Sequence, residues 1–139
     1  FFNTEEKKEI VDAIKQAETF TSGEIRVHIE DHCKEDVLDR ASYFFKKLDM
    51  HKTELRNGVL FYFAVKDKKF AVIGDVGINI LVAENFWQHI KDVIINDFKE
   101  GNYKQGLISG ILEVGIQLKK YFPYDTDNDV NELPDEISY

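Results

Sequence analysis

The residues that could most clearly support chemistry are acids near the C-terminal end of the chain. Asp125, Asp127, Asp129 and Glu136 fall on positions 1, 3, 5 and 12 of a calcium-binding loop. That spacing aims several hard oxygens at one cation. The pattern departs from an EF-hand because Val130 stands where the loop requires glycine and no helix is predicted to follow. The alternative interpretation is a solvated acidic tail.

A second set of oxygen-bearing side chains follows a predicted strand in the middle of the chain. Asp75, Asn79 and Glu84 lie where that strand ends and the next helix begins, a common place for ligands in open α/β sheets. Calcium takes about six to eight oxygens, more than the C-terminal acids supply alone. We therefore expect both sets to share one or two Ca²⁺ or Mg²⁺ ions. Capping and turn roles for Asp75 and Glu84 are the alternative.

Other residue patterns that could support chemistry are incomplete. Cys33 and Arg40 are one residue too far apart for the loop of a thiol phosphatase. His28 and His32 have only Cys33 nearby, so ordinary exposed histidines are expected in place of a zinc site. The stretch Asp125-Thr126-Asp127 resembles an aspartyl-phosphate nucleophile motif but follows a predicted helix and not a strand. The sequence therefore predicts no catalytic residue and no residue that binds an organic cofactor.

Composition limits the class of protein and its partners. The chain has 139 residues, 43% of them hydrophobic, which suits one domain with a sizeable core. Its net charge of -8 repels nucleic acid and anionic membranes, and no basic patch offsets it. No apolar run approaches the roughly 18 residues that span a bilayer. We expect a monomer without membrane insertion, with the cytoplasm favoured and an unidentified protein partner left open.

The elements that must position these residues follow from hydrophobic periodicity. An unbroken apolar run over 59–65 and a second run over 70–73 predict a hairpin buried on both faces, which needs helices above and below it. Alternation over 24–30 predicts a half-exposed strand near a sheet edge. The spacing of apolar residues predicts helices over about 4–20, 34–48, 83–99 and 102–121.

Individual residues refine that outline. Asn3 and Glu6 have the types and spacing of a capping box at the first helix. Gly106 and Gly110, one turn apart, predict that the last helix sits very close to a neighbour. Trp87 is predicted to be largely buried against the sheet, because it shares a helical face with residues 90 and 94.

Five short motifs, in order along the chain, carry a family resemblance. They are Ser22-Gly23-Glu24-Ile25, Asn57-Gly58-Val59-Leu60, Asp67-Lys68, Asp75-Val76-Gly77-Ile78-Asn79, and Gly101-Asn102-Tyr103 with Gly106. Together they resemble the TPM domain family, which groups thylakoid-lumen phosphatase-like proteins of photosystem II repair, acetylcholine-receptor modulators and many bacterial proteins. The resemblance covers about residues 1–122 and suggests a stand-alone, bacterial-type member. It implies a Rossmann-like α/β/α sandwich, a short mixed sheet flanked by helices on both faces. Residues 123–139 are expected to form an acidic C-terminal segment that packs on the same domain.

The resemblance also implies function, since some members bind divalent cations and some have acid phosphatase activity. We expect a divalent-cation-binding domain with a metal-responsive binding or regulatory role. The first alternative is a metal-dependent acid phosphatase, in which the cation polarises a phosphoryl oxygen and Asp67 or Asp75 handles the proton or orients water. The second is a structural interaction module whose partner contacts the region of Trp87.

Arg56 and Asn79 stand where the family often has acids, so we expect no turnover, or very weak turnover, of small phosphate esters. The measurement is hydrolysis of a chromogenic phosphate ester by the purified protein with and without chelator. Robust, chelator-sensitive hydrolysis that is lost on Asp75→Asn would contradict this expectation.

Overall fold

The protein is built around a mixed sheet of three strands. The computed structural model describes residues 1–125 and 131–139. Strand β1 (Glu24–Glu30) runs parallel to β2 (Gly58–Ala64), and β3 (Lys69–Gly74) runs antiparallel to β2, in the order β1-β2-β3. The sheet is therefore short and mixed, as predicted, with β1 at one edge.

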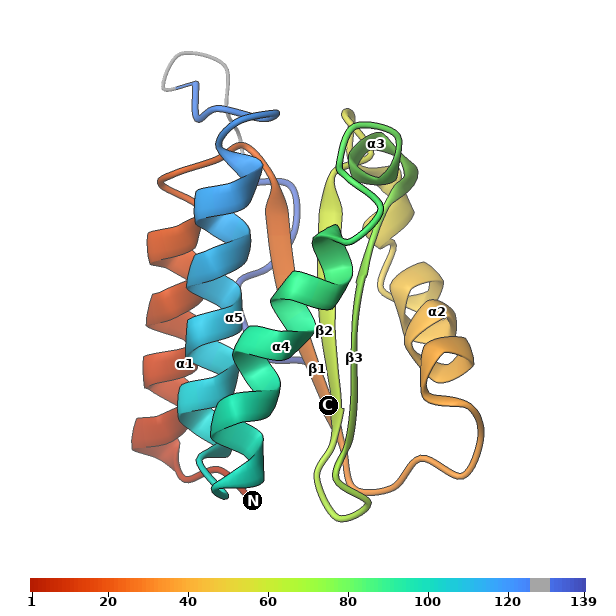
Figure 1. Cartoon of the computed structure of the whole chain (residues 1–139), viewed down its shortest axis with the longest axis vertical. Coiled ribbons are helices and arrows are strands. Elements are labelled where there is room, and N and C mark those ends of the chain that lie inside the picture. Colours follow the sequence, from red (N-terminus) through yellow and green to blue (C-terminus); the bar gives the residue numbers. More distant parts are fainter. Residues whose placement is uncertain (126–130) are drawn as a thin grey trace.

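Helices cover both faces of the sheet, which makes the α/β/α sandwich predicted from the sequence (Figure 1). Helices α1 (Thr4–Ala17), α4 (Phe86–Lys99) and α5 (Tyr103–Leu118) pack on one face. Helix α2 (Val37–Lys47) packs on the other, followed by the short 3₁₀ helix η1 (Met50–Lys52). A single helical turn, α3 (Val76–Asn79), lies at the end of β3. Within the described residues, no helix is both long and apolar enough to cross a membrane.

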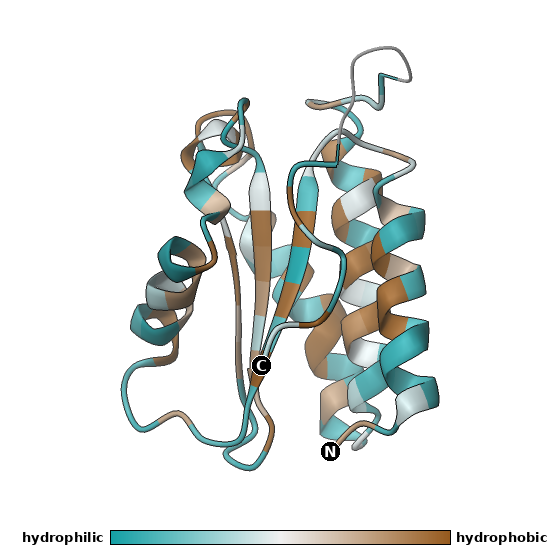
Figure 2. Cartoon of the chain, turned by 180° about the vertical axis from the view of Figure 1, so that it is seen from behind, coloured by the Kyte–Doolittle hydropathy of each residue, from teal (hydrophilic) through white to brown (hydrophobic). Residues whose placement is uncertain are grey.

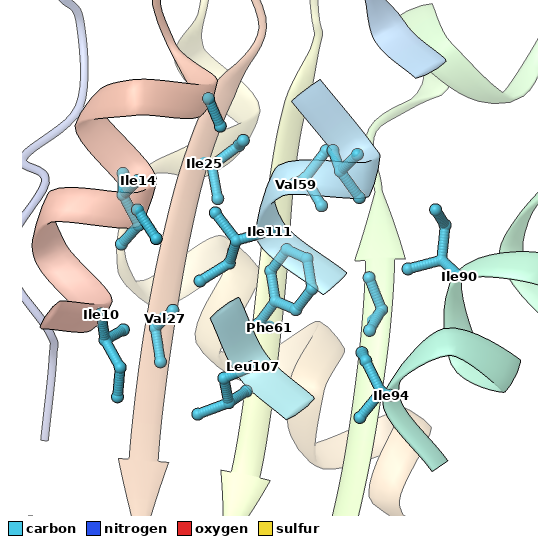
Figure 3. Close-up of a cluster of buried hydrophobic side chains, with 14 of the residues drawn as sticks. Ile10, Ile14, Ile25, Val27, Val59, Phe61, Ile90, Ile94, Leu107 and Ile111 are labelled. Atoms are coloured by element: carbon cyan, nitrogen blue, oxygen red, sulfur yellow. The ribbon is translucent and has the colours of Figure 1, made fainter. Parts of the chain in front are cut away.

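Strand β2 is the centre of the core, because all seven of its residues are buried. Successive side chains of a strand point to opposite faces. Accordingly Val59, Phe61 and Phe63 join the cluster under α1, α4 and α5, seen in Figure 3, whereas Leu60 and Tyr62 join the cluster under α2. This double burial explains why the sequence of β2 is apolar without alternation.

Short-range signals in the sequence account for the ends and spacing of the helices. The main-chain N–H of Glu6 donates to Asn3 Oδ1 at 2.8 Å and that of Asn3 donates to Glu6 Oε1 at 3.1 Å, so the predicted capping box is confirmed. A Cβ atom on Gly106 would lie 2.5 Å from the Phe98 ring, and one on Gly110 would lie 2.7 Å from Ile94. The predicted close approach of α5 to a neighbour, here α4, is therefore confirmed.

Strand β1 differs from the prediction, because it is almost wholly buried and not half-exposed. The C-terminal segment (131–139) runs beside its free edge (Figure 2). The N–H of Ile29 donates to the Ser138 carbonyl at 2.8 Å, and the N–H of Ser138 donates to the Val27 carbonyl at 2.9 Å. His28, predicted to be exposed, is 1% exposed and stacks on Phe44 with ring centroids 3.7 Å apart.

Helix boundaries also shift where local caps override periodicity. Asp36 caps α2 by accepting from the N–H groups of Leu38 and Asp39, so that helix begins after the predicted position 34. The turn α3 was not predicted, and α4 begins at Phe86 and not at residue 83.

Gly115 generates a prediction about the contact between α5 and α1. A Cβ atom there would lie 2.9 Å from Ala17 Cβ and 3.0 Å from Ala17 Cα, and no rotamer change moves either atom. Gly115→Ala gains about 1 kcal/mol of helix propensity but incurs overpacking of about 1–3 kcal/mol. We expect a net loss of unfolding free energy of about 1 kcal/mol in urea denaturation.

The control is Ile116→Ala on the same helix, where the side chain is 53% exposed and only a small change is expected. A Gly115→Ala protein more stable than the parent would show that the helices are not in close contact.

Candidate functional site

Asp75 is held by the protein itself at the end of β3. Its Oδ1 accepts the N–H of Val76 at 2.7 Å and thereby caps α3. Both carboxylate oxygens also accept from Arg56, Oδ2 from Nε at 2.7 Å and Oδ1 from Nη2 at 2.8 Å. Asp75 is 5% exposed. A cation at Asp75 would therefore compete with a guanidinium that already neutralises the carboxylate.

The other two predicted ligands of this set have different surroundings. Asn79 donates from Nδ2 to the Gly74 carbonyl at 2.9 Å and accepts at Oδ1 from Trp87 Nε1 at 2.8 Å. Glu84 is exposed in the turn before α4. Trp87 is partly buried, less than predicted, because it lies at the margin of the sheet and keeps its indole N–H on Asn79. The structure gives Asn79 a positioning contact with Trp87.

The structure describes only one of the three C-terminal aspartates that the sequence analysis selected as metal ligands. Asp125 is exposed and follows Pro123, which bridges to Thr21, whereas Asp127 and Asp129 lie outside the described residues. Asp75 and Asn79 line a cavity of about 490 Å³, while Tyr124, next to Asp125, lines a separate cavity of about 260 Å³. Among residues 1–125 and 131–139, no three or more His, Cys, Asp or Glu side chains form a ready-made metal site.

Three acids that the sequence analysis did not select meet at the smaller cavity. Glu18 ends α1, Glu24 begins β1, and Asp135 comes from the C-terminal segment; we refer to them as the carboxyl cluster. The N–H of Glu132 donates to Glu24 Oε1, which fixes the segment against the start of β1. Asn131 donates from Nδ2 to Asp135 Oδ1 at 3.2 Å and also lines the cavity.

Burial and mutual contact change the proton affinity of the carboxyl cluster. Burial first, and then a hydrogen bond with Asp135, raises the pKa of Glu18 to about 10, although the N–H of Ile25 donates to Glu18 and opposes the shift. Burial also raises the pKa of Glu24, which hydrogen-bonds to Glu18. At neutral pH Glu18 therefore keeps its proton within the cluster.

Other side chains that could support chemistry are hydrogen-bonded or paired within the protein. The Cys33 thiol is buried and donates to the Glu35 carbonyl at 3.3 Å. Asp67 accepts from the N–H of Cys33 at 2.7 Å and pairs with His32 Nδ1 at 2.9 Å; the His32 contact is the main cause that lowers the pKa of Asp67. His28 bonds instead to Ser138 Oγ at 3.0 Å, so the two histidines do not form a pair.

Comparison with known proteins places the chain in a family. The model of the TPM domain matches residues 1–117. The chain belongs to the TPM domain family. The BA42 protein of the psychrophilic bacterium Bizionia argentinensis, solved by NMR, is similar at 52% identity with a TM-score of 0.93, over 99% of this chain and 94% of that one. None of the curated proteins gives a significant match.

Two more distant structures share the fold of this TPM domain. The N-terminal domain of a protein from P. gingivalis has 17% identity and a TM-score of 0.70, over 87% of this chain and 78% of that one. The N-terminal domain of the cg2496 protein from Corynebacterium glutamicum has 8% identity and a TM-score of 0.67, over 99% of this chain and 80% of that one. Both show the fold alone.

The sequence carried one usable signal for the carboxyl cluster. Glu24 belongs to the Ser22-Gly23-Glu24 motif that helped to identify the family, yet its place in an alternating strand suggested exposure. Glu18 and Asp135 had no comparable signal, because their proximity depends on how the C-terminal segment returns to β1.

The raised pKa of Glu18 predicts how stability depends on pH. An ordinary glutamate near 4.5 is ionised in the unfolded chain above that pH, whereas folded Glu18 keeps its proton up to about pH 10. Folding therefore takes up a proton, and the unfolding free energy falls by up to about 1.4 kcal/mol per unit as pH rises from 7 to 9. We expect Glu18→Gln to flatten this slope in urea titrations.

Glu113→Gln is the control, because hydrogen bonds from Gln117 and His89 lower the pKa of Glu113, which is then ionised in both states over this range. Burial lowers the pKa of His28 to about 4, so His28 acts only at lower pH. An unchanged slope in Glu18→Gln would contradict the assignment.

Proposed function

We propose that this TPM domain binds a divalent cation, Ca²⁺ or Mg²⁺, at the carboxyl cluster. The observation that supports the proposal is that Glu18, Asp135 and the buried Glu24 line one cavity. Carboxyl groups that lie this close must either keep a proton or gain a cation. Because Glu18, Glu24 and Asp135 do not form a ready-made metal site, a cation would draw them together as it replaces the Glu18 proton. Metal binding to such a group would release that proton.

The donor atoms suit a hard cation. Carboxylate oxygens are the preferred ligands of Ca²⁺ and Mg²⁺, and the Asn131 side chain adds an amide oxygen at the same cavity. We further propose that Asp125, Asp127 and Asp129 supply oxygens, since the chain that carries them connects Tyr124 to Asn131, both of which line the cavity. Lys15, also at the cavity, limits the net negative charge when no cation is bound.

A cation at this place would make the C-terminal segment responsive to metal. Asp135 and Asn131 belong to the segment, whereas Glu18 and Glu24 belong to the sandwich, so an ion between them ties the two together. The same segment adds to the edge of β1 through Ser138. We propose that binding tightens this edge and thereby serves a metal-responsive binding or regulatory role.

The phosphatase alternative has weaker support from the described residues. It assigns the proton or the water to Asp67 or Asp75, but these acids pair with His32 and Arg56 respectively. A carboxylate whose pKa is lowered by its partner, as for Asp67, is a poor proton donor near neutral pH.

The proposal predicts the result of a Ca²⁺ and Mg²⁺ titration followed by amide chemical shifts. Shifts should centre on Glu18, Glu24 and residues 131–135, and Asp135→Asn should weaken binding roughly tenfold or more, because one charged ligand is lost. Asp12→Asn, an exposed acid on α1, removes the same charge and should have little effect.

Asp75→Asn separates this proposal from the site first predicted from the sequence. It should leave the affinity nearly unchanged, because Asp75 pairs with Arg56. Equal weakening by Asp12→Asn and Asp135→Asn would mean diffuse attraction by net charge, and would refute a defined site.

A further inference from the structure

The two edges of the sheet differ in how their main-chain groups are used. At the β1 edge, the C-terminal segment pairs through Ser138. At the opposite edge, β3 pairs with β2 alone among the described strands. An edge strand with free N–H and C=O groups is a template for another strand.

The register shows which groups of β3 face outward. The N–H of Asp75 donates to the Gly58 carbonyl at 3.0 Å, so this pair is hydrogen-bonded, and hydrogen-bonded pairs alternate along an antiparallel ladder. Ile73 and Ala71 therefore bond to β2, whereas Phe70, Val72 and Gly74 direct their main-chain groups away from it. The Gly74 carbonyl agrees, since it accepts from the Asn79 side chain.

A groove follows this edge. Helices α2 and α4 pack on opposite faces of the sheet, and the cavity of about 490 Å³ lies between them with β3 as its floor. Val72, Ile73 and Gly74 line the floor. Phe45 and Trp87 contribute apolar walls from the two helices.

Lys91 brings a positive charge to the groove in a protein of net charge -8. Arg56, Lys91 and His51 all line it. Arg56 is neutralised by Asp75, which leaves Lys91 and His51 to face an incoming group. His51 Nδ1 is buried and has no hydrogen-bond partner in the described part of the chain.

We propose that this groove binds an extended acidic peptide of another protein as an added strand on β3. The outward groups of Phe70 and Val72 would pair with the peptide main chain, as in other β-augmentation complexes. An apolar side chain would lie between Phe45 and Trp87, and a carboxylate would meet Lys91. The cavity volume suits a few residues of such a strand. This site is separate from the proposed cation site.

The test selects displayed random octapeptides on the purified protein and then measures the binding of the selected peptides. We expect sequences that combine acidic and apolar residues, a change in the fluorescence of Trp87, the only tryptophan, and slowed amide exchange at Phe70 and Val72. Amides of Ala71 and Ile73, which face β2, should change little.

Lys91→Glu should weaken a selected peptide roughly tenfold or more, because the charge facing its carboxylate is reversed. Lys99→Glu, exposed in the last turn of the same helix, is the matched control and should have little effect. Both variants should keep the parent's response to Ca²⁺, which separates failure here from failure of the cation proposal.

Four outcomes would overturn the inference. The first two are failure to select any peptide and selection of peptides that shift amides away from β3. The third is equal weakening of peptide binding by Lys91→Glu and Lys99→Glu. The fourth is displacement of a selected peptide by benzoate, a small carboxylate, with no slowing of amide exchange at Phe70 and Val72. A dimer in which β3 of one copy pairs with β3 of another and excludes the peptide would also overturn the inference, because the occupant would then be a second copy of this chain.

Discussion

The rest of the structure depends on the complete burial of β2. A strand with seven buried residues needs a packed layer on each face and a hydrogen-bonded neighbour on each edge. Three helices supply one layer and α2 the other, and the first layer fits only because glycines let α5 approach α1 and α4 closely. Strands β1 and β3 supply the neighbours and become edges themselves. The two edges are completed differently, since the C-terminal segment pairs with β1 whereas β3 pairs with β2 alone among the described strands.

At the β1 edge, the pairing that completes the sheet also brings acidic side chains together. Pairing of Ser138 with β1 buries His28 and brings the acids of the C-terminal segment to Glu18 and Glu24. Burial of like charges is unfavourable unless a proton or a cation intervenes. Burial first, and then the contact with Asp135, raises the pKa of Glu18 to about 10, which reflects that cost. A divalent cation bound at the carboxyl cluster would relieve the cost and make the edge sensitive to metal.

The sequence predicted features whose cause is local and failed where the cause is a distant segment. Apolar runs, the Asn3 capping box and the glycines of α5 specified the strands, the helices and their layers. The exposure of β1 was mispredicted because its outer face is covered by Phe44 of α2 and its edge is paired with Ser138, more than a hundred positions away. For the same reason the sequence analysis missed Glu18 and Asp135. It selected Asp75 as a metal ligand because the ion pair with Arg56 does not follow from the sequence.

The most direct test of cation binding at the carboxyl cluster is a count of protons released when Ca²⁺ binds. Calorimetric titration at pH 8, in two buffers of different ionisation enthalpy, gives this number from the difference between the observed binding enthalpies. We predict release of about one proton, which Glu18→Gln abolishes, because the cation replaces the proton carried by Glu18. Binding of Ca²⁺ without proton release, or release that persists in Glu18→Gln, would contradict cation binding at this cluster.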